Sequence, residues 1–168
     1  MDEILILDGY NVIFAWPALN ERMQNLNLEA ARELLMDWMT DFRGATGVQI
    51  IVVFDAHSSA TATALPTETS VGGIGQVFTA RDQTADSYIE KATYEISKRN
   101  RVRVATSDGL EQLIILGNGA LRVPATELRR EVEAVNADIR RMLDGNNAKK
   151  NGRAVERALR KAMEERES

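Results

Sequence analysis

The sequence predicts an α/β fold: a three-layer α/β/α domain with a mainly parallel central sheet. Three observations predict the layers. The apolar runs ILIL and IIVVF each end at a phenylalanine or leucine followed by aspartate, as expected of strands buried on both faces. Segments with apolar residues at helical spacing alternate with these runs, which favours parallel pairing. The chain has 168 residues, 44% of them hydrophobic, enough for one core.

The pattern in the first half of the sequence predicts two strands, one helix and one long loop. A strand over residues 3–7 leads into a polar loop, after which Asn27 is placed to cap a helix that ends near a pair of glycines. The second strand covers residues 48–54. Residues 56–75 are rich in Ser, Thr and Ala, and we expect a loop there, either a lid or clamp over a site or a simple flexible connection.

The second half repeats the alternation with shorter elements. We expect a strand over 76–79 and a helix over 85–98, which Asp82 or Thr84 caps. A strand from residue 101 ends in Thr-Ser-Asp, and a short helix and a brief strand follow it. The helix beyond Pro124 carries apolar residues that we expect in the core: Leu128, Val132, Val135, Ile139 and Met142.

The composition changes near the C-terminus. The chain has a net charge of −4, but residues 144–168 hold seven Lys and Arg against five Asp and Glu. We therefore expect one domain over residues 1–143 and a basic, polar C-terminal tail over 144–168. Val155, Leu159 and Met163 recur every four residues, so an amphipathic helix on a partner is one interpretation of this tail.

The composition also excludes several classes of site and location. The chain has no cysteine, which excludes disulfides, thiolate zinc sites and cysteine nucleophiles. The N-terminal residues are acidic, unlike a signal peptide, and no apolar stretch approaches the roughly 20 residues that span a bilayer. We therefore expect a cytoplasmic protein that does not enter a membrane.

Four aspartates lie just past apolar runs or at a helix start: Asp8, Asp55, Asp86 and Asp108. Because the carboxyl ends of parallel strands meet at one edge of a sheet, these carboxylates should converge. Clustered carboxylates repel one another unless a cation or proton offsets their charge, and Mg²⁺ and Mn²⁺ prefer carboxylate oxygens. The pattern predicts a divalent-metal site for one or two Mg²⁺ or Mn²⁺ ions.

Neighbouring polar residues have two interpretations each. Glu90 lies four residues after Asp86 on the same helix face, so it either supports the site or pairs with nearby side chains and solvent. Asp108 either binds metal or caps the next helix, and Thr106 and Ser107 are placed to orient its carboxylate.

The motifs ILDGYNVI, VVFDAH, VFT with TADSYIE, and VATSDGLEQ occur in this order along the chain. In this combination they resemble the YacP-like branch of the NYN-domain family, which is related to PIN-domain nucleases. The resemblance covers residues 3–143 and leaves out the tail. It implies a PIN-like fold, metal-dependent endoribonuclease activity, and an association with ribosomes and messenger RNA.

The resemblance also implies roles for single residues. The family's catalytic residues correspond to Asp8, Asn11, Asp86 and Asp108, of which the three aspartates are the implied metal ligands. Asn11 either positions water or phosphate or is a turn residue.

Residues outside this set have weaker support. Asp55 is expected to support the site from behind the ligands. His57 is either a substrate contact or an incidental loop residue, and Arg81 and Lys91 are candidate contacts to RNA.

Other protein classes compete with a nuclease. A receiver-like phosphoacceptor domain needs a lysine at the end of a later strand, and neither Arg103 nor the ATSD terminus supplies it. A haloacid-dehalogenase-like phosphatase needs a second acid at the position that Tyr10 occupies. A non-catalytic RNA- or ribosome-binding module explains the basic tail but leaves the acidic cluster unexplained. The oligomeric state is open.

Overall fold

A six-stranded sheet forms the centre of the computed structural model, which describes residues 2–57, 59–107 and 117–167. The strands are β1 (Glu3–Asp8), β2 (Gln49–Phe54), β3 (Thr67–Val71), β4 (Ile74–Phe78), β5 (Arg101–Ala105) and β6 (Leu121–Val123). Their order across the sheet is β3-β4-β2-β1-β5-β6, and every pairing is parallel except that of β3 with β4. The predicted mainly parallel α/β sheet is confirmed.

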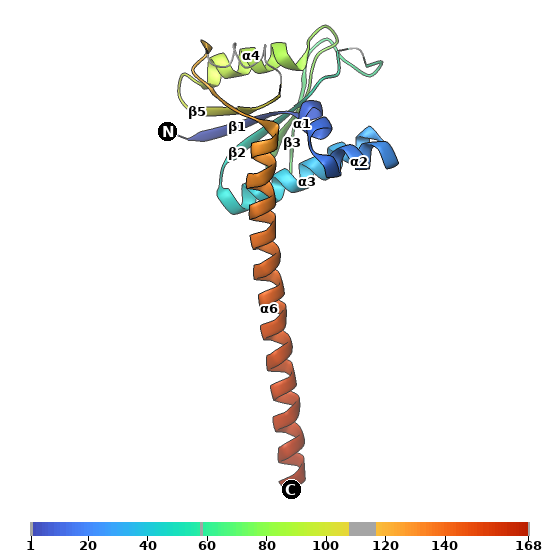
Figure 1. Ribbon diagram of the computed structural model, residues 1–168, viewed down its shortest axis with the longest axis vertical. Helices are drawn as coiled ribbons and strands as arrows, with labels where there is room; N and C mark the ends of the chain where they lie inside the picture. Colours follow the sequence, from blue (N-terminus) through green and yellow to red (C-terminus); the bar gives the residue numbers. More distant parts are fainter. Residues whose placement is uncertain (1, 58, 108–116, 168) are drawn as a thin grey trace.

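Helices cover both faces of this sheet (Figure 1). They are α1 (Gly9–Ala15), α2 (Pro17–Asn25), α3 (Leu28–Thr46), α4 (Ala85–Ile96) and α6 (Ala125–Glu167). Helix α4 packs on one face, and α1, α2, α3 and the start of α6 pack on the other. Along β1, Leu5 and Leu7 belong to the α1–α3 core, whereas Ile4 and Ile6 belong to the α4 core. Burial on both faces explains the uninterrupted apolar run and confirms the three layers.

Two of the predicted helix starts are confirmed by their capping bonds. The side chain of Asn27 accepts a hydrogen bond from the Ala30 amide at 2.8 Å at the start of α3. At the start of α4, the Thr84 side chain accepts one from the Ser87 amide at 3.2 Å, so Thr84 is the cap instead of Asp82.

Residues 9–25 form two short helices, where the sequence predicted a polar loop. Helix α1 ends before Trp16, and Pro17 begins α2 at the position where proline is well tolerated. Trp16 is 1% exposed, and its ring N–H donates to the Ala125 carbonyl at 2.7 Å. Each helix is shorter than the window over which helical periodicity is visible in a sequence.

Part of the predicted loop over 56–75 is a β-hairpin. Strand β3 pairs antiparallel with β4 through Gly72 and Gly73, whose φ angles are +60° and +83°. Positive φ at both positions is what a two-residue hairpin turn requires. All five residues of β3 are exposed, so TETSV lacks the alternating pattern that identifies a half-buried strand.

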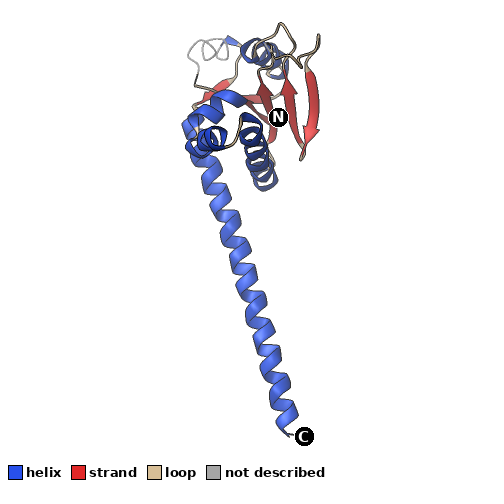
Figure 2. Cartoon of the chain, turned by 90° about the vertical axis from the view of Figure 1, so that its right-hand side faces the viewer, coloured by secondary structure: helices blue, strands red, loops and turns tan. Residues whose placement is uncertain are grey.

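Helix α6 crosses the predicted boundary at residue 143 without a break and extends far from the sheet (Figure 2). Leu128 and Val132 are buried as predicted, but Met142 is 68% exposed because the helix has by then left α3 and the sheet. We call residues 140–167 the C-terminal arm and residues 2–139 the body. Although α6 is long, neither it nor any other described helix is apolar enough to cross a membrane.

Candidate functional site

Asp8 lies at the carboxyl edge of the sheet, where β1 ends. It aligns with Val53 of β2, so Asp55 lies two residues further along, just past the end of the neighbouring strand. The chain then turns directly into α1 at Gly9, which is buried. A Cβ atom at Gly9 would collide with the Phe54 ring, which explains why glycine follows the aspartate. The fold thus places the first two predicted carboxylates on adjacent strand ends.

Asp55 joins this edge to the start of α4. One carboxylate oxygen accepts a hydrogen bond from the Ala85 amide at 3.2 Å, and the other accepts one from the His57 amide at 3.1 Å and contacts the His57 ring nitrogen. Partial burial by itself raises the pKa of Asp55, but these hydrogen bonds outweigh it and lower the pKa below its ordinary value. The charged Asp55 carboxylate therefore links the end of β2 to the start of α4. Asp86 is the residue after Ala85, so it lies in the helix turn that Asp55 holds at this edge.

Asp8 and Asp86 are half-buried, whereas Glu90 is exposed. Glu90 and Lys91 line a hollow of about 270 Å³ along α4, together with Tyr94 and Asn118. The Asn118 side chain donates to the Glu90 carbonyl at 3.2 Å. This hollow shares no lining residue with the larger pocket beside Asp55, so the structure does not bring Glu90 and Lys91 to that pocket.

Asn11 connects α1 to the end of β5. Its side-chain oxygen accepts a hydrogen bond from the Ser107 amide at 2.9 Å. The preceding Thr106 is fully buried, and its amide donates to the Val123 carbonyl at 3.3 Å. These contacts fix the backbone that leads to Asp108, which lies outside the described residues. Asn11 therefore holds the backbone at Ser107, and its predicted catalytic role stays a prediction.

The metal prediction depends on Asp108. Over residues 2–57, 59–107 and 117–167, no three His, Cys, Asp or Glu side chains form a group that could hold a metal ion. Mg²⁺ needs only one or two protein carboxylates, because waters and substrate phosphates complete its shell. Asp8, at the end of β1, and Asp86, in the first turn of α4, are half-buried carboxylates of the kind that this requirement calls for. The three-aspartate ligand set stays a prediction.

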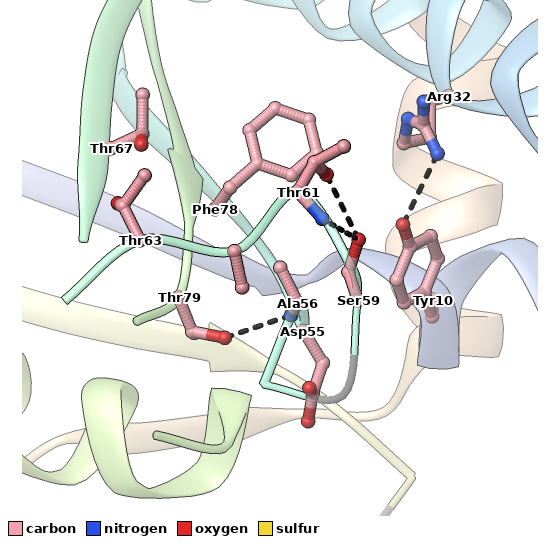
Figure 3. Close-up of a pocket in the computed structure, with 11 residues that line it drawn as sticks. Tyr10, Arg32, Asp55, Ala56, Ser59, Thr61, Thr63, Thr67, Phe78 and Thr79 are labelled. Atoms are coloured by element: carbon pink, nitrogen blue, oxygen red, sulfur yellow. Dashed lines mark hydrogen bonds between the residues drawn. The ribbon is translucent and has the colours of Figure 1, made fainter. Parts of the chain in front are cut away.

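A pocket of about 370 Å³ opens beside Asp55 (Figure 3). Its walls come from α1, α3, β3, β4 and the segment after β2: Tyr10, Arg32, Asp55, Ala56, Ser59, Thr61, Ala62, Thr63, Thr67, Phe78 and Thr79. Arg32 donates to the Tyr10 hydroxyl at 3.2 Å, and its guanidinium lies 5.5 Å from the centre of the Phe78 ring. The pocket thus combines one cation, one carboxylate, two aromatic rings and a row of hydroxyls.

Arg81 and His57, two predicted substrate contacts, bond to residues that line this pocket. Arg81 donates from its side chain to the Ala62 carbonyl at 3.2 Å and from its amide to the Thr63 carbonyl at 2.8 Å. His57 contacts Asp55. Both residues therefore shape the segment between β2 and β3, and their predicted contact with RNA is untested.

Sequence reasoning missed three residues of the pocket: Tyr10, Arg32 and Phe78. In the sequence, Tyr10 argues only against a phosphatase, although its place directly after Asp-Gly at a strand end is a signal of a site residue. Arg32 lies on the polar side of α3, 22 residues from Tyr10, and nothing in its neighbourhood distinguishes it from a solvated arginine. Only the packing of α3 on the sheet brings it there.

The chain is similar to known proteins over most of its length. A family model described as the YacP-like NYN domain matches residues 5–167, so it includes the arm. The uncharacterized protein YacP of Bacillus subtilis (strain 168) is 41% identical over 140 residues, which are 83% of this chain and 80% of that protein.

Solved structures of the protein called Rae1 (YacP) from Bacillus subtilis are also similar. One crystal structure superposes with a TM-score of 0.74 at 36% identity, covering 98% of this chain and 93% of the other. A mutant of the same protein gives 0.72 at 38% identity, covering 88% and 85%. The chain therefore belongs to the YacP-like NYN domain family, a nuclease-type family with a PIN-like fold.

Proposed function

We propose that this protein is a metal-dependent endoribonuclease that hydrolyses phosphodiester bonds of messenger RNA, in association with ribosomes in the cytoplasm. The observation that carries the proposal is the hydrogen bond by which Asp55, just past the strand next to Asp8, holds the start of α4 one residue before Asp86. Membership of a nuclease-type family supports the same activity.

Asp8, Asp86 and Asp108 would hold one or two Mg²⁺ or Mn²⁺ ions. A bound ion supplies an activated water and offsets charge that develops on the scissile phosphate. Asp8 has a fixed position because its residue is paired within the sheet, and Asp55 restrains the helix that carries Asp86. Asn11 holds the backbone of Ser107, the residue before the third carboxylate in the sequence. The positive end of the α4 dipole at this edge favours the phosphate.

A non-catalytic RNA- or ribosome-binding module is the second candidate, and the arm favours it. Arg153, Arg157 and Arg160 are exposed and spaced at one helical turn, so they lie on one side of α6. Such a row of arginines can bind phosphates of RNA without catalysing cleavage. This candidate predicts binding of RNA or ribosomes by a protein that does not cleave.

The test is cleavage of messenger RNA, both naked and bound to ribosomes, with Mn²⁺ and then with chelator. We expect Asp8→Asn or Asp86→Asn to lower the cleavage rate by about 10²–10³-fold, as loss of a group that stabilises transition-state charge does. Asp82→Asn is the matched control. Asp82 is exposed near the same helix start, and its substitution removes the same charge.

Cleavage that survives Asp8→Asn and Asp86→Asn, or that ignores the chelator, would overturn the proposed site. Binding of ribosomes without cleavage under any of these conditions would favour the non-catalytic module.

A further inference from the structure

We infer that the pocket beside Asp55 binds one nucleotide of an unpaired RNA strand next to the cleaved bond, with Arg32 donating to its phosphate. This inference rests on the proposed function, because it names the part of the substrate that lies beside the acidic edge. It makes Arg32 a binding residue that positions the strand and contributes to the choice of cleavage site.

The first observation is the ionic environment of Arg32. Arg32 is part-buried, yet no carboxylate of the described residues forms an ion pair with it, although Glu29 and Glu33 lie on the same helix. Arg103 is also part-buried, but it pairs with Glu3 at 2.5 Å and with Glu131 at 3.2 Å. A part-buried cation without a protein anion is costly unless a ligand supplies the negative charge. The contrast leaves the Arg32 guanidinium available to an external anion.

The second observation is that the guanidinium of Arg32 is held in place. It lies over the Phe78 ring at 5.5 Å and donates to the Tyr10 hydroxyl at 3.2 Å. Phe78 in turn stacks on the fully buried Phe54 with ring centres 5.4 Å apart. A planar guanidinium fixed in this way loses little freedom when it binds a phosphate with two parallel hydrogen bonds.

The third observation is the hydroxyl wall that faces Arg32. Thr63 and Thr67 lie on the side of the pocket opposite Arg32 and Tyr10, with Ser59 and Thr61 between them (Figure 3). Hydroxyl groups both donate and accept, which suits the 2′-hydroxyl of a ribose and the edges of an unpaired base. A volume of about 370 Å³ is at the small end of ligand sites, enough for one nucleotide and too small for a duplex.

The position of the pocket connects the nucleotide to the proposed chemistry. Asp55 lines the pocket and also binds the amide of Ala85 at the start of α4. Its charge is compensated by that amide and by His57, so it does not prevent a phosphate from binding at the Arg32 side. The pocket therefore adjoins the start of α4, the helix that carries Asp86.

The test measures binding of a short, unstructured, fluorescently labelled RNA to the Asp86→Asn protein in chelator, over a range of salt concentrations. We expect Arg32→Ala to weaken binding about tenfold or more, as loss of a charged hydrogen bond does. It should also reduce the slope of log affinity against log salt by about 0.7, because one phosphate contact is lost.

Three variants separate a contact from a structural role. Arg32→Lys should keep the salt slope of the wild type with part of its affinity. Arg32→Gln should show the same reduction of the slope, about 0.7, as Arg32→Ala, although it keeps a donor for Tyr10. Arg22→Ala is the matched control, since Arg22 is exposed on α2 and lines a different hollow. Circular dichroism on each variant identifies any loss of fold, and Arg32→Gln replaces Arg32→Ala if the latter unfolds.

Equal affinity and equal salt slope in Arg32→Gln and Arg22→Ala would overturn the inference. The outcome is independent of the nuclease proposal. If the wild-type protein cleaves RNA but Arg32 variants bind RNA normally, the nucleotide-binding inference is wrong and the nuclease proposal is unaffected. If the wild-type protein never cleaves but Arg32 variants lose RNA affinity, the nuclease proposal fails and the nucleotide pocket stands. In an active protein, the expected signature is a raised KM with kcat nearly unchanged.

Discussion

Helix α6 belongs to two regions that are stabilised in different ways. In the body, Leu128 and Val132 are buried against α1, α3 and the sheet. In the arm, every side chain that the structure describes is exposed, including Leu159 at 61% and Met163 at 69%. Burial of apolar surface therefore holds the first part of the helix, whereas the arm has only its own hydrogen bonds, helix-forming residues and neighbouring charges.

The comparison teaches where stability and chemistry lie. All predicted site residues that the structure describes belong to the body, and the arm adds reach and basic charge. Yet the family match extends through the arm to residue 167. The arm is therefore part of what the family model matches, although none of its described side chains is buried.

The largest expected effect comes from one substitution made in both regions. Leu128→Ala should lower the free energy of unfolding by about 3 kcal/mol, because it leaves a cavity in the core. Leu159→Ala should change it by less than about 0.5 kcal/mol, since Leu159 packs against nothing in the body. Chemical denaturation of both variants measures the difference. Equal losses would mean that the arm folds back onto the body or pairs with a second copy in solution.

The next effect concerns the bond that joins the start of α6 to the rest of the body. Trp16→Phe should cost about 1–2 kcal/mol, because the buried Ala125 carbonyl loses its 2.7 Å hydrogen bond to the indole. Trp38→Phe is the control, since Trp38 is only partly buried and stacks on Trp16 at 6.1 Å. Thermal unfolding of the two variants compares them. A smaller loss for Trp16→Phe than for Trp38→Phe would contradict the role of this bond.

The sequence predicted those elements whose burial pattern is visible locally. The strands β1 and β2 are apolar on both faces, and Asn27 and Thr84 are typical caps, so their positions were predictable. Strand β3 was missed because exposure on all five residues removes alternation, although Gly72-Gly73 was a turn signal. The arm was separated from the domain by its composition, which carries no information about whether a helix continues.

The same distinction applies to the site. Asp8 and Asp55 could be placed from topology alone, because strand ends share an edge. The role of Asp55 as an acceptor for the Ala85 amide depends on how α4 packs, 30 residues away, and no sequence pattern reports it. Arg32 is the clearest case, since its position depends on the packing of α3, β4 and α1 together.

A third prediction uses the charge of Asp55. Hydrogen bonds lower the pKa of Asp55 below its ordinary value of 3.8. The stabilisation from its charged carboxylate is therefore fully present above about pH 4, and it is lost as the pH falls through the lowered pKa. Asp55→Asn should therefore cost about 1 kcal/mol at neutral pH, and the difference from wild type should shrink below about pH 4. Asp144→Asn, in the exposed arm, should cost nothing at any pH. Urea denaturation at several pH values checks both, and a pH-independent loss for Asp55→Asn would show that its charge is not what stabilises.

The smallest expected effect on the whole protein is also the one most specific to the arm. Gly152 lies within α6, and apart from its two chain neighbours and the nearby backbone of its own helix, no heavy atom lies within 4 Å of the Cβ that an alanine would add. Gly152→Ala should stabilise the arm helix locally by about 1 kcal/mol, because glycine is a poor helix former. Amide hydrogen exchange around residue 152 should slow by about fivefold, while the unfolding midpoint of the body stays the same. If the midpoint of the body rises as well, the arm and the body unfold as one unit, and the division between them is only one of exposure.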